Sequence, residues 1–247
     1  MKISVITATY NCAASVRATI SSVLAQDWPD LEYIVVDGAS TDGTVDVVKE
    51  FGDRISVFVS EPDSGVYDAM NKGLELASGE WCAFMNAGDV YSGPGVISAM
   101  FADTELLSGK KVVYGNTEYV YPDGRSVLHP TADLKGLGRM MSKYQPYSHQ
   151  AVFYSISDKS DCRYDLRYRI CADYDVACRY WKRYGAGAYH YVPVTVCRYK
   201  AYDGISSKPE NLRKTHREML LVKLSNHMSP LETAKDALRL LLHIDSK

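Results

Sequence analysis

The sequence of 247 residues predicts an α/β fold built on a mostly parallel sheet. Short apolar, β-branched segments alternate with segments of helical periodicity over the first 115 residues, which is typical of a parallel sheet covered by helices on both faces. Polar loops follow several of the expected strands, and ligands bind beyond the carboxyl ends of strands in such sheets. We therefore expect a Rossmann-like fold with its binding site at that edge.

The expected elements of this first part follow one another at short spacing. Strands are expected at residues 3–7, 31–36, 55–59 and 81–85. Helices are expected at residues 14–26, 45–51 and 66–77. The strand at 31–36 is nearly continuous in apolar residues, as a strand buried on both faces should be. The loops that begin at Asp37 and Asn86 then lie at carboxyl ends of strands, where we expect the chemistry.

The pattern changes from about residue 112. Strands are expected at 112–116 and 117–121, with Pro122-Asp123-Gly124 as a hairpin turn. Residues 125–150 are expected to be rich in loops, with a mobile spot at 136–138. The remaining expected elements are a helix at 172–184 ended by Gly185, a strand at 192–199, and amphipathic helices at 210–224 and 230–243.

The composition is that of an ordinary globular protein, with 46% hydrophobic and 23% charged residues. The net charge of −2 gives no reason to expect a nucleic-acid partner. Residues 1–157 carry 11 Lys and Arg against 19 Asp and Glu, whereas residues 158–247 carry 17 against 11. This asymmetry favours an acidic, metal-binding first part and a basic tail that contacts phosphate or a lipid surface; two solvated surfaces are the alternative.

The six cysteines lack the spacing of a zinc or redox motif, and we expect free thiols in a reducing compartment. The N-terminal apolar run is too short for a signal peptide. No apolar stretch reaches the roughly 18 residues that a membrane-spanning helix needs. We expect a cytoplasmic location, with peripheral contact to the inner face of the cytoplasmic membrane as a further expectation.

Four segments carry the informative motifs, and each of them begins at or near the end of an expected strand. The segments are Ala8-Thr9-Tyr10-Asn11, VVDGASTDGT at 35–44, EPDSGVYDAMNKG at 61–73 and FMNAGD at 84–89. In this order they resemble the nucleotide-sugar-binding half of family-2 inverting glycosyltransferases of the GT-A fold. The resemblance is dense over residues 1–95 and looser to about 205. It implies a nucleotide-sugar-binding subdomain at 1–115, an acceptor-binding subdomain of the same domain at 116–205, and a C-terminal helical extension at 206–247.

The resemblance assigns the nucleotide contacts to residues of the first half. Asp37 would contact uracil, Thr7 and Thr9 would line the same pocket, and Asp63 would lie beside the base or ribose. Asn71 and Lys72 would lie near the phosphates. The alternatives are structural: Asp37 and the turn at 62–65 can each cap a following helix.

Asn86-Ala87-Gly88-Asp89 stands where the family carries its metal motif of the DxD type. Mg²⁺ and Mn²⁺ prefer oxygen ligands and can be held by one carboxylate together with substrate phosphates. The resemblance therefore implies Asp89 as the ligand of Mn²⁺ or Mg²⁺, with Asn86 contributing through its amide oxygen. Gly88 and Asn86 replace the further carboxylates of many members, which predicts weaker metal binding without substrate.

The segment Arg169-Ile170-Cys171-Ala172-Asp173-Tyr174-Asp175 resembles the second acidic cluster of the family. It implies that Asp173 is the catalytic base, which takes the proton of the acceptor hydroxyl. Ala172 stands where a Glu is usual. The alternative is that Asp173 only stabilises the first turn of a helix.

Three further residues are expected to contact donor or acceptor. His149 and Gln150 lie in a segment that resembles the approach to the acceptor side of the family. Arg198 would steady the leaving pyrophosphate, beside a closing loop at 203–207. For His149 the alternative is an ordinary structural histidine.

Together these residues predict inverting transfer of a sugar from a UDP-sugar to a hydroxyl of a glycan or a polyprenyl-linked glycan, in surface-polysaccharide synthesis. The apolar stripes of the C-terminal helices predict packing on the catalytic domain, contact with a second subunit, or docking to anionic lipid. Two other functions stay open. A nucleotidyltransferase would need a Gly-rich basic loop after the first strand, which Ala8–Cys12 does not provide, and a non-catalytic nucleotide-sugar-binding protein would lack a working base.

Overall fold

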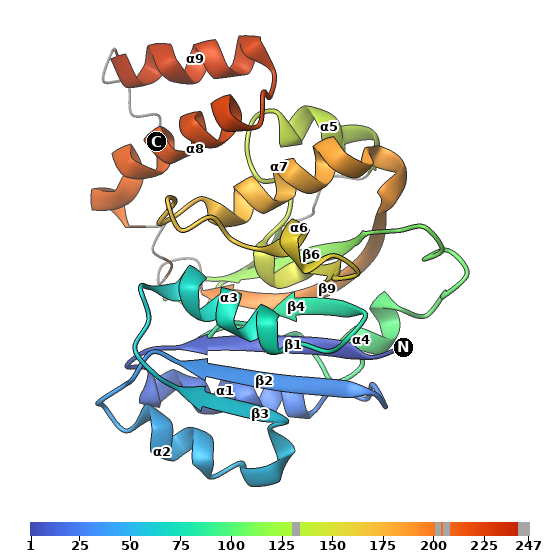
Figure 1. Cartoon of the computed structure of the whole chain (residues 1–247), viewed down its shortest axis with the longest axis vertical. Coiled ribbons are helices and arrows are strands. Elements are labelled where there is room, and N and C mark those ends of the chain that lie inside the picture. The colour runs from blue at the N-terminus through green and yellow to red at the C-terminus, as the bar shows by residue number, and fades with distance from the viewer. Residues whose placement is uncertain (130–133, 201–203, 205–207, 242–247) are drawn as a thin grey trace.

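The computed structural model describes residues 1–129, 134–200, 204 and 208–241. Within this part of the chain, one sheet of nine strands crosses the molecule and helices cover both of its faces (Figure 1). The strands are β1 (Ile3–Thr9), β2 (Leu31–Asp37), β3 (Val57–Ser60), β4 (Trp81–Phe84), β5 (Val90–Tyr91), β6 (Val112–Val120), β7 (Ser126–His129), β8 (Val152–Ser155) and β9 (Tyr189–Lys200). The helices are α1 (Ala13–Leu24), α2 (Thr44–Lys49), α3 (Val66–Leu76), α4 (Val96–Met100), α5 (Leu134–Met141), α6 (Lys159–Cys162), α7 (Ala172–Tyr184), α8 (Leu212–Ser225) and α9 (Pro230–Leu241).

The strands are arranged in the order β3-β2-β1-β4-β8-β6-β9-β5, and β7 pairs with β6 outside this path. Strands β1 to β4 are parallel, so that Thr9, Asp37 and Ser60 lie side by side at their carboxyl edge. Strand β8 runs antiparallel to both β4 and β6, whereas β6 and β9 are parallel. The sheet is therefore mixed, and the predicted parallel arrangement holds for its N-terminal half.

Alternation along the strands divides the core into two clusters, one on each face of the sheet. From β1, Ile3 and Val5 belong to the cluster that contains Val16 and Ile20 of α1. Ile6, the next residue of β1, belongs to the other cluster, which α3 and α7 cover. The apolar faces of the predicted helices thus pack on the sheet as their periodicity indicated.

Two expectations for the middle of the chain are wrong. The strands expected at 112–116 and 117–121 are one continuous strand, β6. The segment 125–150 contains β7 and α5, and the expected mobile spot at 136–138 lies inside α5. Leu137 is fully buried there, and a Cβ atom on Gly138 would lie 2.8 Å from the ring of Trp181, so this segment is closely packed.

Helices α8 and α9 lie at one end of the molecule, beyond α7 (Figure 1). The buried ammonium group of Lys223 on α8 pairs with Asp236 on α9 and joins the two helices. Helix α9 leaves Leu231, Leu238 and Leu241 more than half exposed. Among the described helices, none combines the length and the apolar character needed to cross a membrane.

Candidate active site

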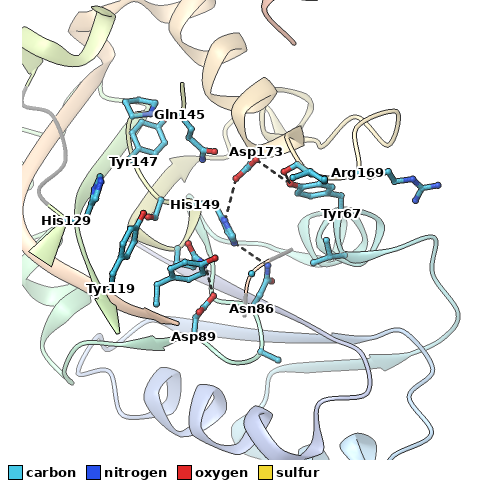
Figure 2. A pocket seen from close by; sticks show the side chains of 18 residues that line it. Tyr67, Asn86, Asp89, Tyr119, His129, Gln145, Tyr147, His149, Arg169 and Asp173 are labelled. Carbon is cyan, nitrogen blue, oxygen red and sulfur yellow. Dashed lines mark hydrogen bonds and ion pairs between the residues drawn. The ribbon is translucent and has the colours of Figure 1, made fainter. Parts of the chain in front are cut away.

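A cavity of about 480 Å³ opens at the carboxyl edge of the sheet. The site was predicted at this edge from the polar loops that follow the strands. Its walls come from segments far apart in the sequence: the loop after β4, the start of α3, the η2 turn His149–Ala151, the start of α7, and the β6, β7 and β9 strands (Figure 2). Asn86, Asp89, His149, Gln150 and Asp173 all line it. Five of the residues predicted to act in catalysis therefore meet in one place.

Asp89 forms the floor of this cavity in the loop between β4 and β5. Its side chain is largely buried, and Gln150 Nε2 donates a hydrogen bond of 2.7 Å to Asp89 Oδ2. The hydroxyl of Thr19 on α1 donates to the Asp89 carbonyl at 2.8 Å and accepts from the Gly88 N–H at 3.0 Å. Helix α1 thereby fixes the backbone of the loop, and Gln150 orients the Asp89 carboxylate.

Asp173 lies across the cavity, in the first turn of α7. Its Oδ1 accepts a hydrogen bond from the Tyr174 N–H at 2.9 Å. The Tyr67 hydroxyl donates to the Ile170 carbonyl at 2.6 Å and makes a longer contact of 3.3 Å with Asp173 Oδ1. Asp173 Oδ2 lies 3.6 Å from His149 Nδ1. Burial and the charge of Asp173 raise the pKa of the Tyr67 phenol well above its ordinary value, so that Tyr67 stays a hydrogen-bond donor. Oδ1 of Asp173 is thus held by the backbone of α7, while Oδ2 lies on the side of His149.

The segment that leads into α7 is held by Glu218 of α8. This buried carboxylate accepts hydrogen bonds from the backbone N–H groups of Arg169, Ile170 and Cys171, at distances between 2.8 and 3.1 Å. Three donors from consecutive residues fix the backbone immediately before Asp173. The C-terminal helix α8 is therefore part of the support of the site.

His149 connects the two sides of the cavity. Its Nε2 lies 3.4 Å from Asn86 Nδ2, and its Nδ1 faces Asp173 (Figure 2). The Ala8 N–H donates to Asn86 Oδ1 at 3.4 Å, which assigns the amide oxygen to Ala8 and the NH₂ group to His149. In the neutral ring Nε2 is then the acceptor, and the proton on Nδ1 points toward the Asp173 carboxylate.

Asp37 is fully buried at the end of β2, and its carboxylate is saturated by internal donors. Oδ1 accepts from the hydroxyls of Thr9 and Ser40, and Oδ2 accepts from the Ser40 N–H and the Ser60 hydroxyl, at 2.5 to 2.9 Å. Burial alone would raise the pKa of Asp37, but these hydrogen bonds, led by those from Ser40, lower it below its ordinary value. Asp37 therefore fastens the loop after β2 to the ends of β1 and β3. Thr7 is buried too, bonded to the Tyr33 hydroxyl and the Met85 carbonyl.

Asp63 lies beside this loop and is partly exposed. Its Oδ1 accepts from the Gly65 N–H at 2.8 Å. A Cβ atom on Gly38 would lie 2.4 Å from Asp63 Oδ2 and 3.2 Å from the ring of Tyr10. The backbone of Gly38 is therefore packed between the Tyr10 ring and the Asp63 carboxylate, at the edge where the resemblance places the base and ribose.

Thr7, Thr9, Asp37 and Asp63 do not line the cavity, and three further predicted contact residues also lie outside it. Asn71 is buried, and its amide exchanges two hydrogen bonds with the backbone of Tyr164, of 2.9 and 2.8 Å. Lys72 pairs with Glu61 at 2.7 Å and donates to the Pro62 carbonyl.

The third is Arg198, which pairs with Glu118 at 2.9 Å, whereas the next residue, Tyr199, lines the cavity. Neighbouring strand residues face opposite sides, so this placement argues against the pyrophosphate contact predicted for Arg198. The closing loop predicted at 203–207 lies, except for Gly204, outside the described residues.

The oxygen ligands that Asp89 and its neighbours offer suit a hard cation whose remaining ligands would come from the substrate. The described residues hold no cluster of three or more His, Cys, Asp or Glu side chains that would bind a metal by themselves. Asp89 nevertheless places a carboxylate in the cavity, close in the chain to the amide of Asn86. One carboxylate with phosphate oxygens is a common arrangement for Mg²⁺.

Several residues that line the cavity were not predicted from the sequence. They are Tyr67, Tyr119, His129, Gln145, Arg169 and Tyr199. For Tyr67 a signal exists, because it stands in the first turn of a predicted helix, directly after the motif that contains Asp63. Arg169 likewise stands in the segment whose resemblance predicted Asp173. For Tyr199 the pairing of β9 with β6, which brings it to the cavity, had no sequence signal.

The sequence matches the family model described as "Glycosyl transferase family 2" over residues 4–164. It is also similar to the PGL/p-HBAD biosynthesis glycosyltransferase of Mycobacterium tuberculosis, with 32% identity over 209 residues that cover 83% of this chain and 78% of the relative. A shorter match of 90 residues, at 42% identity, relates it to the putative teichuronic acid biosynthesis glycosyltransferase TuaG of Bacillus subtilis and covers 35% of this chain and 36% of that protein.

Solved structures share the fold. S. aureus TarS 1–349 in complex with UDP superimposes with a TM-score of 0.69 at 20% identity, covering 98% of this chain and 71% of that one. Glucosyl-3-phosphoglycerate synthase of Mycobacterium tuberculosis, in complex with Mn²⁺, UDP and glucosyl-3-phosphoglycerate, gives 0.60 at 18% identity, covering 91% and 79%. Because the family model covers well over half of the sequence and the fold agrees, this chain belongs to glycosyl transferase family 2 and is a glycosyltransferase with the GT-A fold.

Proposed function

We propose that this glycosyltransferase is metal-dependent and moves a sugar, with inversion, from a UDP-sugar to a hydroxyl of a glycan or lipid-linked glycan in surface-polysaccharide synthesis. The observation that carries the proposal is that Asp89 and Asp173 line one cavity and that His149 lies between them (Figure 2). A carboxylate for the leaving group and a carboxylate for the acceptor proton are the two groups that a direct displacement requires.

In this reaction the acceptor oxygen attacks the anomeric carbon while Asp173 Oδ2 takes the proton of the hydroxyl. The bond between the anomeric carbon and the diphosphate oxygen breaks on the opposite face, and its electron pair leaves with the diphosphate. Attack and departure on opposite faces invert the configuration. The Tyr174 N–H holds Asp173 Oδ1, and the Tyr67 hydroxyl lies beside this oxygen, so that rotation of the base is restricted during the transfer.

His149 is a positioning residue for this base. Its Nδ1–H points at the charge of Asp173, and its Nε2 is held by Asn86 in the loop that carries Asp89. Mn²⁺ or Mg²⁺, held by Asp89 with the help of Asn86, would neutralise the charge of the leaving diphosphate. The amide of Gln150 keeps the Asp89 carboxylate oriented.

UDP is the proposed nucleotide, and structural neighbours support it, since TarS and glucosyl-3-phosphoglycerate synthase were both solved with UDP. Asp63 and the Tyr10–Gly38 surface are the proposed contacts of the nucleoside, with Thr7, Thr9 and Asp37 holding the strand ends behind them. Asn71 and Lys72 support this region from α3 through their bonds to neighbouring backbone.

The proposal for Asp173 is tested by the variant Asp173→Asn, which keeps the size of the side chain and removes the base. We expect UDP release from UDP-sugars, measured with methyl glycosides as acceptors, to fall by about 10²- to 10⁴-fold. Binding of UDP with Mn²⁺, measured by calorimetry, should stay near the wild-type value because the nucleoside contacts are elsewhere.

Glu118→Gln is the matched control, because Glu118 is a carboxylate on β6 that pairs with Arg198 and does not line the cavity. Turnover of this control should stay close to that of the wild type. Wild-type turnover in Asp173→Asn would contradict the assignment of the base. A wild type that binds UDP and turns over none of the UDP-sugars would support a non-catalytic binding protein instead.

The exposed leucines of α9 fit a peripheral contact with the membrane that carries a polyprenyl-linked acceptor, or a contact with a second copy of the chain. The six free thiols support the cytoplasmic side of that membrane. Sedimentation with vesicles of anionic lipid, compared between wild type and Leu238→Glu, separates the two contacts. Loss of sedimentation with an unchanged monomer favours the membrane; a dimer that Leu238→Glu dissociates favours the second copy.

A further inference from the structure

Three aromatic rings line the same wall of the cavity, and none of them has a role in the chemistry described above. Tyr119 comes from β6, His129 from β7 and Tyr199 from β9. The Tyr119 and His129 rings are stacked, with centroids 4.9 Å apart and an interplanar angle of 25°, and the Tyr199 ring centroid lies 5.5 Å from that of Tyr119. We call these three residues the aromatic shelf.

The strand register explains why the three rings share one side of the sheet. Tyr119 is paired with Tyr199 across β6 and β9, and Thr117 is paired with His129 across β6 and β7. Paired residues face the same side, as do residues two apart on one strand, so all these side chains point in one direction. Burial raises the pKa of the Tyr119 phenol above its ordinary value.

The position of the aromatic shelf along the sheet indicates whether it contacts the donor or the acceptor. From the proposed nucleoside site at the ends of β1 to β3, the strand order leads through β4, whose loop carries Asp89, and then through β8 to β6 and β9. A donor laid along this edge has its nucleoside at one end and its sugar near Asp89. The shelf lies past that point, and Figure 2 shows Tyr119 and His129 on the opposite side of the cavity from Tyr67 and Arg169.

A buried polar atom belongs to another residue that lines the same cavity. The Nε2 atom of Gln145, which lines the cavity, is buried and has no hydrogen-bond partner among the described residues. An unpartnered buried donor costs free energy unless a ligand or water satisfies it. A hydroxyl group of a substrate would accept this hydrogen bond.

Aromatic ring surfaces and an unpartnered donor in one cavity match the chemistry of a pyranose, which presents C–H groups on its face and hydroxyls around its edge. We infer that the aromatic shelf, together with Gln145, binds a sugar ring of the acceptor and so contributes to acceptor specificity. This inference rests on the proposed function, because it places the acceptor beside the donor sugar. It predicts that the acceptor ends in a pyranose and excludes a purely aliphatic alcohol as the preferred substrate.

The test uses methyl β-D-glucopyranoside, methyl β-D-galactopyranoside and methyl α-L-rhamnopyranoside as probes, in the presence of UDP and Mn²⁺. Saturation-transfer NMR measures the affinity of each glycoside for the wild type, Tyr119→Ala and Tyr119→Phe. The matched control is Tyr121→Ala, since Tyr121 lies just past the end of the same strand but stacks on Arg125 and does not line the cavity. Melting temperature and UDP affinity verify that each variant is folded.

We expect at least one glycoside to bind the wild type and to bind Tyr119→Ala about tenfold more weakly, because the ring surface is lost. Tyr119→Phe and Tyr121→Ala should bind it within about twofold of the wild type. Equal affinity in Tyr119→Ala, equal loss in Tyr121→Ala, or no binding of any probe to a wild type that binds UDP overturns the shelf and leaves the proposed function standing. A wild type that binds no UDP contradicts the proposed function itself.

Discussion

The two oxygens of the Asp173 carboxylate have different surroundings. Oδ1 is held by the Tyr174 N–H and lies beside the Tyr67 hydroxyl, whereas Oδ2 lies on the His149 side. The Asp89 carboxylate is oriented in a similar way, because Gln150 donates a hydrogen bond to one of its oxygens. At the residue scale, the site consists of carboxylates that fixed donors orient, so that little reorganisation is needed when substrate binds.

Gly38 is the residue at which a single added methyl group tests the proposed nucleoside site. The Cβ atom of Gly38→Ala would lie 2.4 Å from Asp63 Oδ2, so the Asp63 carboxylate must move away. We expect UDP to bind about tenfold more weakly, as measured by calorimetry, because a displaced carboxylate loses its contact with the nucleoside.

Gly93→Ala is the matched control for this variant, because a Cβ atom at Gly93 meets no heavy atom within 4 Å. Its UDP affinity should equal that of the wild type. If Gly38→Ala binds UDP as tightly as Gly93→Ala does, Asp63 has no part in nucleoside binding.

The carboxylates of the site could be predicted from the sequence, because each follows a strand or begins a helix within a motif. The direction of Arg198 could not, because strand alternation fixes it only once the pairing with β6 is known. Tyr119 and Tyr199 were missed for the same reason, because their strands lie about 80 residues apart in the sequence and no local pattern encodes such pairing. His129 was missed because the strand that follows the predicted hairpin turn at 122–124 was expected to be a loop.

At the element scale, β6 shows why a local signal failed. The sequence predicted two strands, with the boundary directly after Gly115 and Asn116, which are residue types depleted in strands. The strand is nevertheless continuous, because its pairing with β9 shifts register at these two residues and resumes beyond them. A Cβ atom on Gly115 would lie 2.6 Å from the Val194 carbonyl, so glycine is what permits the close approach of β9.

The contact of α3 with the segment before α7 gives an element-scale prediction. Asn71→Leu removes both hydrogen bonds to the Tyr164 backbone and leaves a buried N–H and C=O unpaired. We expect the free energy of unfolding, measured in urea, to fall by on the order of 2–4 kcal/mol. UDP affinity below the melting transition should change little, because the amide lies outside the cavity.

Lys72→Gln serves as the comparison from the same helix, since it removes only a partly exposed ion pair with Glu61. Its effect on stability should stay below about 1 kcal/mol. A stable Asn71→Leu protein that has lost UDP binding would instead restore the nucleotide contact first predicted for Asn71.

At the scale of the whole molecule, the two edges of the parallel strands differ in role. The carboxyl edge carries the site. The amino edge carries a stabilising cluster around the buried Glu32, whose carboxylate accepts from Ser4, from Ser78 and from Lys2. Burial opposes the charge on Glu32, but the hydrogen bonds from Lys2, Ser4 and Ser78 outweigh it and lower the pKa to about 2 from 4.5.

This shift predicts how stability depends on pH. The folded pKa lies below the unfolded value, so the contribution of Glu32 is complete above pH 4.5 and is lost as the pH falls from 4.5 to about 2. Glu32→Gln should therefore be less stable than wild type at pH 7, by on the order of 2 kcal/mol. The difference should shrink as the pH falls through this window in urea titrations, and a difference that is constant with pH would contradict the role of the charge.

The proposal that this chain transfers sugar by direct inversion is tested most directly by the anomer that it releases. With UDP-α-D-glucose, UDP-α-D-galactose and UDP-α-N-acetyl-D-glucosamine as donors, Mn²⁺, and water or a methyl glycoside as acceptor, ¹H NMR of the anomeric proton identifies the first product formed, before mutarotation. Attack opposite the diphosphate, with Asp173 as base, predicts a β-configured product from an α-configured donor. An α-configured first product, or no product from any of these donors, would contradict the account.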